Sequence, residues 1–388
     1  MLLLILSLGG FAASMAARIV DPLVTAIAAD FIMPVATVAL LASAYTLPFS
    51  FSQPLLGPVG DAIGKSLMIR VALALLAVFL LASAFAPSFS TLMSVRILAG
   101  MAGAGIIPLS FALIGDTFAI AVRQVAMSRF LASTLVGQLV GSSAAGILAE
   151  WIGWRYVLGL SALIAFLAAI AAILWLPRSN QPSNPIDVRE ILQRYGRVLK
   201  NPRAYVCFCS VFLEGGAIYG VTPFIGDIMQ QRQIGGLREA GFAVAGLGLG
   251  GLLYTLVVPL ILKVATRMQM MRAGGILAGL SLMALAIPLS AWGISGVMVF
   301  LGIGFFLIHN SIQTEVTELL PAARASCFAL HAFSFYLGQS VGPILYGQSL
   351  SHFGLQPSVL AGGFVLICVG FGINFFLKRY PPVDAKTA

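Results

Sequence analysis

Charge is scarce in this sequence of 388 residues, because only 9% of the residues are Asp, Glu, Lys or Arg while 60% are hydrophobic. Soluble domains are usually about a quarter charged, so a soluble fold could not cover this much apolar surface. Helices of about 20 apolar residues in a bilayer satisfy their own backbone hydrogen bonds. The composition therefore excludes an ordinary soluble protein and indicates an all-α membrane protein.

Metal-binding and nucleotide-binding patterns are also missing from the sequence. The three histidines have no paired spacing, and the four cysteines all lie within apolar runs, which favours unreactive core thiols. There is no phosphate-binding loop of the form GxxxxGKS or GxxxxGKT and no segment large enough for a soluble ATPase domain. The net charge of +9 is spread over short breaks between apolar runs. We therefore expect no cofactor, no metal and no nucleic-acid partner.

Apolar runs separated by polar breaks predict about twelve transmembrane helices in the lipid bilayer. The first run begins at Met1 without a basic leader or a small-residue cleavage pattern, so we interpret it as a span rather than a signal peptide. The expected spans are 2–29, 37–60, 67–86, 90–116, 124–149, 154–176, 204–228, 239–264, 271–291, 294–318, 324–350 and 356–377.

Basic residues are concentrated in one of the two sets of loops that these spans create. Seventeen of the 22 basic residues fall on the side that carries both termini and the polar linker, three on the other side, and two inside spans. Basic loops face the cytoplasm in multi-pass proteins. We therefore predict cytoplasmic termini and a location in a bacterial plasma (inner) membrane.

A polar linker, 177–203, divides the chain into an N-terminal six-helix bundle, 1–176, and a C-terminal six-helix bundle, 204–388. The segment 187–200 is expected to form either a basic amphipathic helix on the inner leaflet or part of a solvated tether. The two halves also carry a repeat, because residues 137–141 read GQLVG and residues 338–342 read GQSVG, a separation of 201 residues. Such duplicated halves are typical of secondary transporters.

The loop after the second span carries a pattern of glycines and charges, since residues 57–66 read GPVGDAIGKS. It resembles the signature between helices 2 and 3 of the major facilitator superfamily, although Ala62 stands where a basic residue is usual. The resemblance implies a conformational latch that stabilises one of two alternating states. Its expected members are Gly57, Asp61, Gly64, Lys65, Asp116 and Arg123.

Other segments resemble the same family. Residues 96–100, RILAG, resemble its intramembrane Arg followed by Gly, and the fifth span resembles a signature associated with antiporters, with Ser142 and Ala145 in place of the typical Pro and Gly. The signature residues in the two halves are Gly137, Gly141, Gly146, Gly338, Gly342 and Pro343. The resemblance implies two pseudo-symmetric six-helix bundles with helices 1, 4, 7 and 10 around the path, and points to the drug/proton antiporter branch.

Charged side chains within the spans are candidates for function, because a charge at the bilayer centre costs about 3 kcal/mol on insertion scales. At about 1.5 Å per residue, Arg96 and Glu214 lie near the midplane. Arg18 and Asp21 share one helix face beside a kink expected at Pro22, either in the path or as a structural ion pair. Glu214 has no basic neighbour at helical spacing, so it either carries a proton or hydrogen-bonds a neighbouring helix.

The tenth span carries a polar group that consists of His309, Asn310 and Gln313. These side chains either bind substrate or hold helices together by hydrogen bonds. His331 in the eleventh span is interpreted as a packing residue.

Three functions fit these features to different degrees. The first is proton-coupled efflux of a small amphipathic or apolar compound by a monomer. The second is import or facilitated diffusion of a nutrient by the same fold, and the altered fifth-span signature favours this second function. The third, an intramembrane enzyme, is disfavoured because Ser142 and Ser143 have no histidine within the first six spans to activate them. We therefore expect a transporter and not an enzyme.

Overall fold

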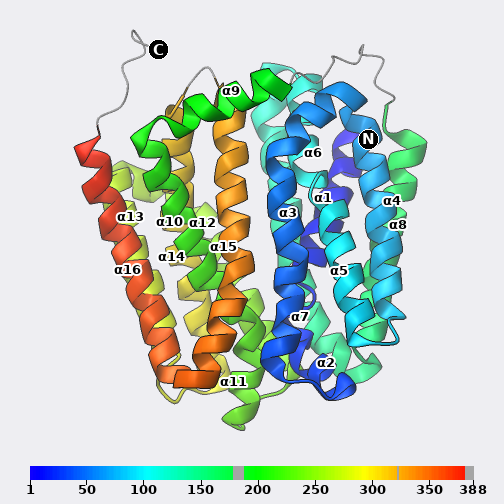
Figure 1. Cartoon of the computed structure of the whole chain (residues 1–388), viewed down its shortest axis with the longest axis vertical. Helices are drawn as coiled ribbons and strands as arrows, with labels where there is room; N and C mark the ends of the chain where they lie inside the picture. Colours follow the sequence, from blue (N-terminus) through cyan, green and yellow to red (C-terminus); the bar gives the residue numbers. More distant parts are fainter. Residues whose placement is uncertain (178–187, 321–322, 381–388) are drawn as a thin grey trace. The chain divides into compact units, whose positions relative to one another are not determined.

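The computed structural model describes residues 1–177, 188–320 and 323–380, and its regular structure is entirely helical within these ranges (Figure 1). The first six predicted spans correspond to α1 (Leu2–Arg18) with α2 (Val24–Phe31), α3 (Val35–Ile63), α4 (Lys65–Ala84), α5 (Phe89–Gly103) with α6 (Ile106–Thr117), α7 (Ile120–Ile152) and α8 (Trp154–Trp175). The later six correspond to α10 (Pro202–Val221) with α11 (Ile225–Gln231), α12 (Leu237–Val264), α13 (Arg267–Ala284), α14 (Ala291–Glu318), α15 (Arg324–Phe353) and α16 (Leu355–Arg379).

Ten of these segments, within the described residues, are long and apolar enough to cross a membrane. The other two predicted spans, α13 and α15, are helices at the expected places but are not among the ten. Helix α15 carries histidine, glutamine and serine side chains that are buried inside the protein, which explains its lower apolar content. The all-α membrane fold predicted from composition is confirmed.

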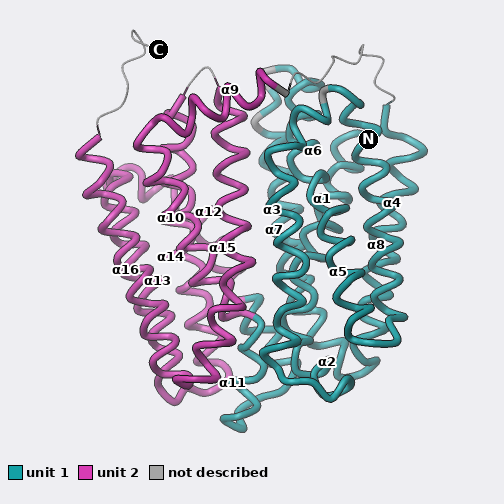
Figure 2. The backbone as a smooth tube through the Cα atoms, in the orientation of Figure 1, with its two compact units in different colours: residues 1–186, 223–245 teal, residues 187–222, 246–388 magenta. Residues whose placement is uncertain are grey.

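The chain forms two compact units, coloured separately in Figure 2. Unit 1 contains residues 1–186 together with 223–245, and unit 2 contains residues 187–222 together with 246–388. The segment 223–245, which we call the hairpin, comprises α11 and the start of α12. It belongs to the unit formed by the first half of the chain.

Proline interrupts the first and seventh spans at matching places of the repeat. A short 3₁₀ turn, Asp21–Leu23, separates α1 from α2, as predicted from Pro22, because proline cannot donate the backbone hydrogen bond that a continuous helix needs. A second 3₁₀ turn, Thr222–Phe224, separates α10 from α11 at Pro223, the equivalent position in the second half. The sequence prediction did not include this break, nor the one at Ala104 and Gly105 between α5 and α6.

Glycines allow the closest turns between neighbouring helices. Gly153 (φ 82°) joins α7 to α8, and Gly354 (φ 78°) joins α15 to α16. Both occupy the left-handed region, which glycine enters without the steric penalty of a Cβ atom. The two glycines hold equivalent positions in the two halves, so the turn geometry follows the repeat.

Close helix contacts also follow the repeat. A Cβ atom at Gly137 of α7 would collide with the carbonyl oxygen of Phe11 in α1. A Cβ atom at Gly338 of α15 would collide with the carbonyl oxygen of Phe212 in α10. The glycines and their partners hold equivalent positions, so the GQxVG repeat marks two equivalent crossings at which small residues let backbones approach closely.

Two helix starts refine the sequence prediction. Helix α9 (Val188–Leu199) confirms a helix within the linker, packs on α10 and α15, and buries Val198. Helix α13 begins at Arg267 rather than at the predicted residue 271, because Thr266 and Gln269 form a capping box that satisfies the first backbone N–H groups. Pro182 and Pro185, which also supported the linker prediction, lie outside the described residues.

Candidate functional site

The buried charges of unit 1 gather around the break in the first span. Arg18 Nη1 lies 3.7 Å from Asp21 Oδ2, and the Asp21 side chain is 1% exposed. Arg96 of α5 is fully buried and donates from Nη1 to the carbonyl oxygen of Ala16 at 3.1 Å. Its guanidinium also lies over the Tyr45 ring, 4.6 Å from the centroid. The structure therefore confirms the predicted Arg18–Asp21 pair and brings Arg96 to the same stretch of α1.

The carboxylate of Glu214 has a basic partner that the sequence did not reveal. Glu214 of α10 is 0% exposed, and its Oε2 lies 3.3 Å from Nδ1 of His309 in α14. Nε2 of the same imidazole lies 3.4 Å from Nε2 of Gln313, one helical turn later. The hydrogen bonds therefore link Glu214, His309 and Gln313 between two helices.

Aromatic and imidazole rings surround this chain of hydrogen bonds. The His331 ring of α15 lies 5.1 Å from the His309 ring, and the Phe335 ring lies 4.5 Å from it. Among the described residues, His331 Nε2 and Glu214 Oε1 are buried without a hydrogen-bond partner. Unsatisfied buried polar atoms are uncommon in proteins. His331, interpreted from sequence as a packing residue, therefore lies beside the candidate site.

Asn310 points to a different neighbour from His309 and Gln313. Its side chain hydrogen-bonds the Tyr254 hydroxyl of α12. This contact supports the interhelical role for Asn310 that the sequence left open, while His309 and Gln313 stay with Glu214.

Two of the residues expected in the latch of the first half form an ion pair. Lys65 Nζ lies 2.7 Å from Asp116 Oδ2, and Arg123 donates to the Phe118 carbonyl oxygen. Gly64 has φ 104° and forms the turn between α3 and α4. Gly57 has open space around it, whereas a Cβ atom at Gly60 would meet Leu109, so Gly60 makes the close helix contact. The side chain of Asp61 lies outside the described residues.

The second half carries an equivalent ion pair that the sequence analysis missed. Arg267 Nη1 lies 3.1 Å from Glu318 Oε1 and 3.2 Å from Glu315 Oε1. Arg203 Nη2 lies 2.6 Å from Glu315 Oε2. Arg267 follows Lys65 by the same number of positions as Glu318 follows Asp116. Both separations are 202 residues, one more than the 201-residue offset of the repeat, so the repeat alone points to the neighbouring Thr266 and Thr317.

The signature glycines of the fifth and eleventh spans lie where the backbone of another helix approaches closely. Gly137 and Gly141 of α7 face the α1 backbone, and Gly342 of α15, followed by Pro343 within the same helix, faces the α10 backbone. Gly146 faces the hairpin instead, because a Cβ atom there would lie 2.8 Å from Cα of Gly241.

A carboxylate reinforces the contact between α7 and the hairpin. Glu150 Oε1, one turn beyond Gly146, accepts a hydrogen bond from the backbone N–H of Arg238 at 2.9 Å. Because this N–H is in the first turn of α12, where backbone donors lack intrahelical partners, the carboxylate caps the helix. The end of α7 away from the linker is thus fixed to the hairpin by packing and by a hydrogen bond.

The chain resembles known transporters along most of its length. The family model described as Major Facilitator Superfamily matches residues 6–343. An uncharacterized MFS-type transporter of Bacillus subtilis, YwfA, is 25% identical, with 100% of this chain and 94% of that protein covered. The purine ribonucleoside efflux pump NepI of Escherichia coli is also 25% identical, with 73% of this chain and 70% of that protein covered.

Two solved structures share the fold. The nucleoside transporter NupG aligns with a TM-score of 0.80 at 15% identity and covers 97% of this chain and 100% of its own. A bacterial homologue of the human lysosomal transporter Spinster aligns with a TM-score of 0.77 at 16% identity and covers 99% of this chain and 98% of its own.

Proposed function

The chain belongs to the Major Facilitator Superfamily, and we propose that it exports a small amphipathic or apolar compound in exchange for protons. Its family makes it an integral multi-pass membrane transporter of a small molecule and not an enzyme. In this proposal it works as a monomer of the drug/proton antiporter branch in a bacterial inner membrane, with cytoplasmic termini. The biased distribution of lysine and arginine supports that orientation.

The contact between Glu214 and His309 carries the proposal for proton coupling. A fully buried carboxylate 3.3 Å from an imidazole can hold a proton in one state and release it in another. Neither residue is needed to anchor the helices by charge, because Arg203 and Glu315 already form a closer ion pair between α10 and α14. A costly buried acid without an evident structural task favours a role in transport.

Alternating access would use the two bundles, 1–176 and 204–388, on either side of the linker 177–203. We assign the ion pairs Lys65–Asp116 and Arg267–Glu318 to the state in which the linker side is latched. We assign the contact of α7 with the hairpin to closure of the opposite side. Each ion pair contains an exposed carboxylate, so it can break and re-form at a small energetic cost.

Purified protein in liposomes tests the coupling directly. A proton gradient is imposed across the vesicle membrane, and substrate movement and internal pH are followed together. We expect substrate to move against protons and to dissipate the gradient. If no imposed proton gradient moves substrate that the protein otherwise exchanges, coupled efflux is excluded.

Nutrient import or facilitated diffusion remains the second candidate, supported by Ser142 and Ala145 at signature positions. The same vesicles separate the two functions, because a facilitator equilibrates substrate without moving protons. Purine ribonucleosides should head the compound panel, since NepI exports them and NupG is a nucleoside transporter.

Asp21→Asn should abolish proton-driven transport and leave the protein inserted in the membrane. The substitution keeps the side-chain size but removes the carboxylate charge that can take part in proton exchange. Transport is measured in vesicles with an imposed gradient, and insertion is measured by the yield of monodisperse protein after detergent extraction.

The double variant Arg18→Gln/Asp21→Asn is the control for a purely structural ion pair. If the pair only helps the helix to insert, the single variant should reduce the yield because Arg18 is left buried beside a neutral amide. The double variant should then restore both yield and transport. Restored transport in the double variant would remove Asp21 from the proton path.

Gly146→Ala should disfavour the contact between α7 and the hairpin. The added Cβ atom would lie 2.8 Å from Cα of Gly241. Cβ atoms in proteins essentially never come closer than 3.0 Å to another heavy atom. Overpacking costs about 1–3 kcal/mol, which corresponds to a shift of about 5- to 150-fold in a conformational equilibrium. Spin labels at Trp151→Cys and Gln231→Cys, in a variant without the native cysteines, would report a longer distance between α7 and α11.

Gly159→Ala is the matched control, because a Cβ atom at Gly159 meets no other atom within 4 Å. It should transport at the wild-type rate with an unchanged distance. Wild-type transport and distance in Gly146→Ala would show that this contact does not govern the transport cycle.

A further inference from the structure

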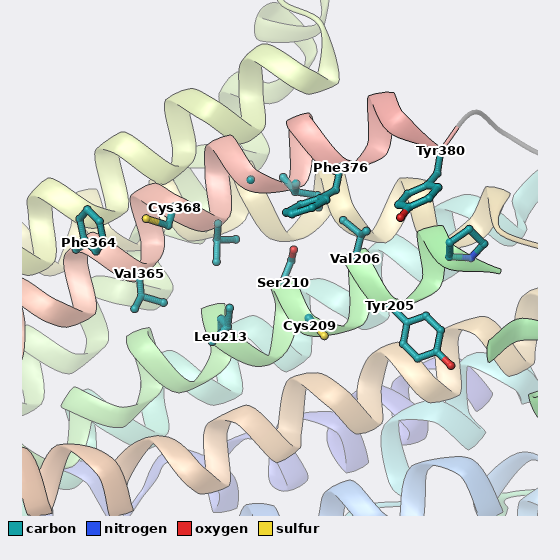
Figure 3. Close-up of a pocket in the computed structure, with 14 residues that line it drawn as sticks. Tyr205, Val206, Cys209, Ser210, Leu213, Phe364, Val365, Cys368, Phe376 and Tyr380 are labelled. Atoms are coloured by element: carbon teal, nitrogen blue, oxygen red, sulfur yellow. The ribbon is translucent and has the colours of Figure 1, made fainter. Parts of the chain in front are cut away.

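A long apolar groove follows the surface of unit 2 between α10 and α16 (Figure 3). Its volume is about 660 Å³, and side chains such as Val206, Leu213, Phe364 and Phe376 form its walls. Figure 3 shows Val206 and Leu213 projecting from α10 toward α16, with Phe376 of α16 opposite them. The groove lies on helices that are long and apolar enough to span the membrane, so lipid is the solvent at this face.

The groove continues along the helices for most of the membrane thickness. A second hollow of about 230 Å³ shares Leu213 and Val365 with it and reaches Ala217 on α10. The helix from Pro202 to Ala217 rises about 22 Å at 1.5 Å per residue. The hydrocarbon core of a bilayer is about 30 Å thick. The shape therefore fits a long, narrow and apolar occupant such as an acyl chain.

Positive charge is concentrated at the end of the groove that lies next to the linker. Pro202 and Tyr380 line this end, and Arg203 donates to the Tyr380 carbonyl oxygen at 2.6 Å, which ties the two helix termini together. Lys200 precedes Pro202 by two residues, and Lys378 and Arg379 immediately precede Tyr380. All three basic side chains are exposed.

A tyrosine also marks the polar end of the groove. Tyr205 is 56% exposed and lines the groove one turn from its start. Tyrosine is enriched where the apolar core of a bilayer meets its headgroups. The apolar walls, the tyrosine and the basic side chains therefore follow one another in the order of the parts of a phospholipid.

We propose that this groove binds an anionic phospholipid, with one acyl chain between α10 and α16 and the phosphate headgroup held by Lys200, Lys378 and Arg379. The site goes beyond the proposed proton-coupled efflux and depends only on the membrane location of unit 2. Leu213, which the acyl chain contacts, directly precedes Glu214. The lipid therefore supports the helix that carries the buried carboxylate.

Photoactivatable lipids in nanodiscs test the site in the full chain. One probe is a phosphatidylglycerol with a diazirine in its acyl chain, and the other is the phosphatidylcholine with the same chains. Cross-linked peptides are mapped by mass spectrometry. We expect phosphatidylglycerol to label α10 and α16 in preference to other lipid-facing helices and in preference to phosphatidylcholine.

Two kinds of variant separate headgroup recognition from chain binding. Lys200→Gln, Lys378→Gln and Arg379→Gln should each weaken phosphatidylglycerol labelling by about fivefold, as expected for one basic residue near an anionic headgroup. Lys263→Gln, at another exposed lysine, should leave the labelling unchanged. Gly372→Trp should fill the groove and abolish labelling by both probes, because Gly372 lines the groove and has open space beside it. Gly159→Trp is its control.

Three results would overturn the proposal. Equal labelling by the two lipids that the glutamine variants do not change would identify an ordinary lipid-facing surface. Labelling of α10 and α16 that persists in Gly372→Trp would place the lipid elsewhere. Displacement of the probe by a transported compound, but not by unlabelled phosphatidylglycerol, would identify a substrate entrance instead. Loss of proton coupling alone would leave the lipid site intact, so the two proposals fail separately.

Discussion

Glu214→Gln is expected to reduce proton-driven transport to the level of empty vesicles. Glutamine keeps the shape of the side chain and a hydrogen bond to His309, but it cannot bind and release a proton near neutral pH. Exchange of labelled for unlabelled substrate at equal pH on both sides should continue, because that partial reaction needs no net proton movement. Both assays use the same proteoliposome preparation.

Glu190→Gln is the control, since this carboxylate lies on α9 outside the predicted spans and is 54% exposed. It should behave as wild type in both assays. If Glu214→Gln accumulates substrate normally under a gradient, proton coupling lies elsewhere. If it loses exchange as well while the protein remains folded, Glu214 contacts the substrate rather than the coupling proton.

Glu315→Gln is expected to lower the free energy of unfolding by about 3–5 kcal/mol, the usual cost of breaking a buried ion pair from one side. The Glu315 side chain is 6% exposed and accepts from both Arg203 and Arg267. Glutamine would leave the Arg203 guanidinium, 9% exposed, without its counter-charge. Unfolding in a denaturing detergent, followed by tryptophan fluorescence, measures the effect.

Glu318→Gln provides the comparison at an exposed site. Glu318 is 51% exposed, and the ion pair that it forms is to Arg267, which is 39% exposed. Exposed ion pairs usually contribute about 0–1 kcal/mol. A similar, small loss in both variants would show that burial does not strengthen the Glu315 contacts.

Hydropathy located the helices well, and local chemistry accounts for most of the boundaries that it missed. The break at Asp21–Leu23 follows from Pro22, and the capping box of Thr266 and Gln269 could have moved the start of α13 to Arg267. The break between α5 and α6 has no proline within it, only Ala104 and Gly105. Pro108, in the first turn of α6, cannot donate a hydrogen bond to the carbonyl oxygen of Ala104, so it is the sequence signal for this interruption.

Contacts between helices could be predicted from the sequence only where one half of the repeat had a counterpart in the other. Arg267 and Glu318 lie 202 residues after Lys65 and Asp116, so the 201-residue repeat locates the second ion pair only to within one residue. Glu214 and His309 could not be located in this way, because they lie far apart in the sequence on different helices and the first half has no equivalent pair to copy. Sequence patterns identify which buried charges need a partner, whereas the packing of helices decides which partner they receive.

The hairpin has a consequence for the synthesis of this protein. Residues 223–245 pack within unit 1, although the ribosome makes them after the whole linker and all of α10. Chains emerge and fold from the N-terminus, and each compact unit is completed only when its last segment is available. The first six spans must therefore wait in the membrane with α7 uncovered at Gly146 until the eighth span begins to insert.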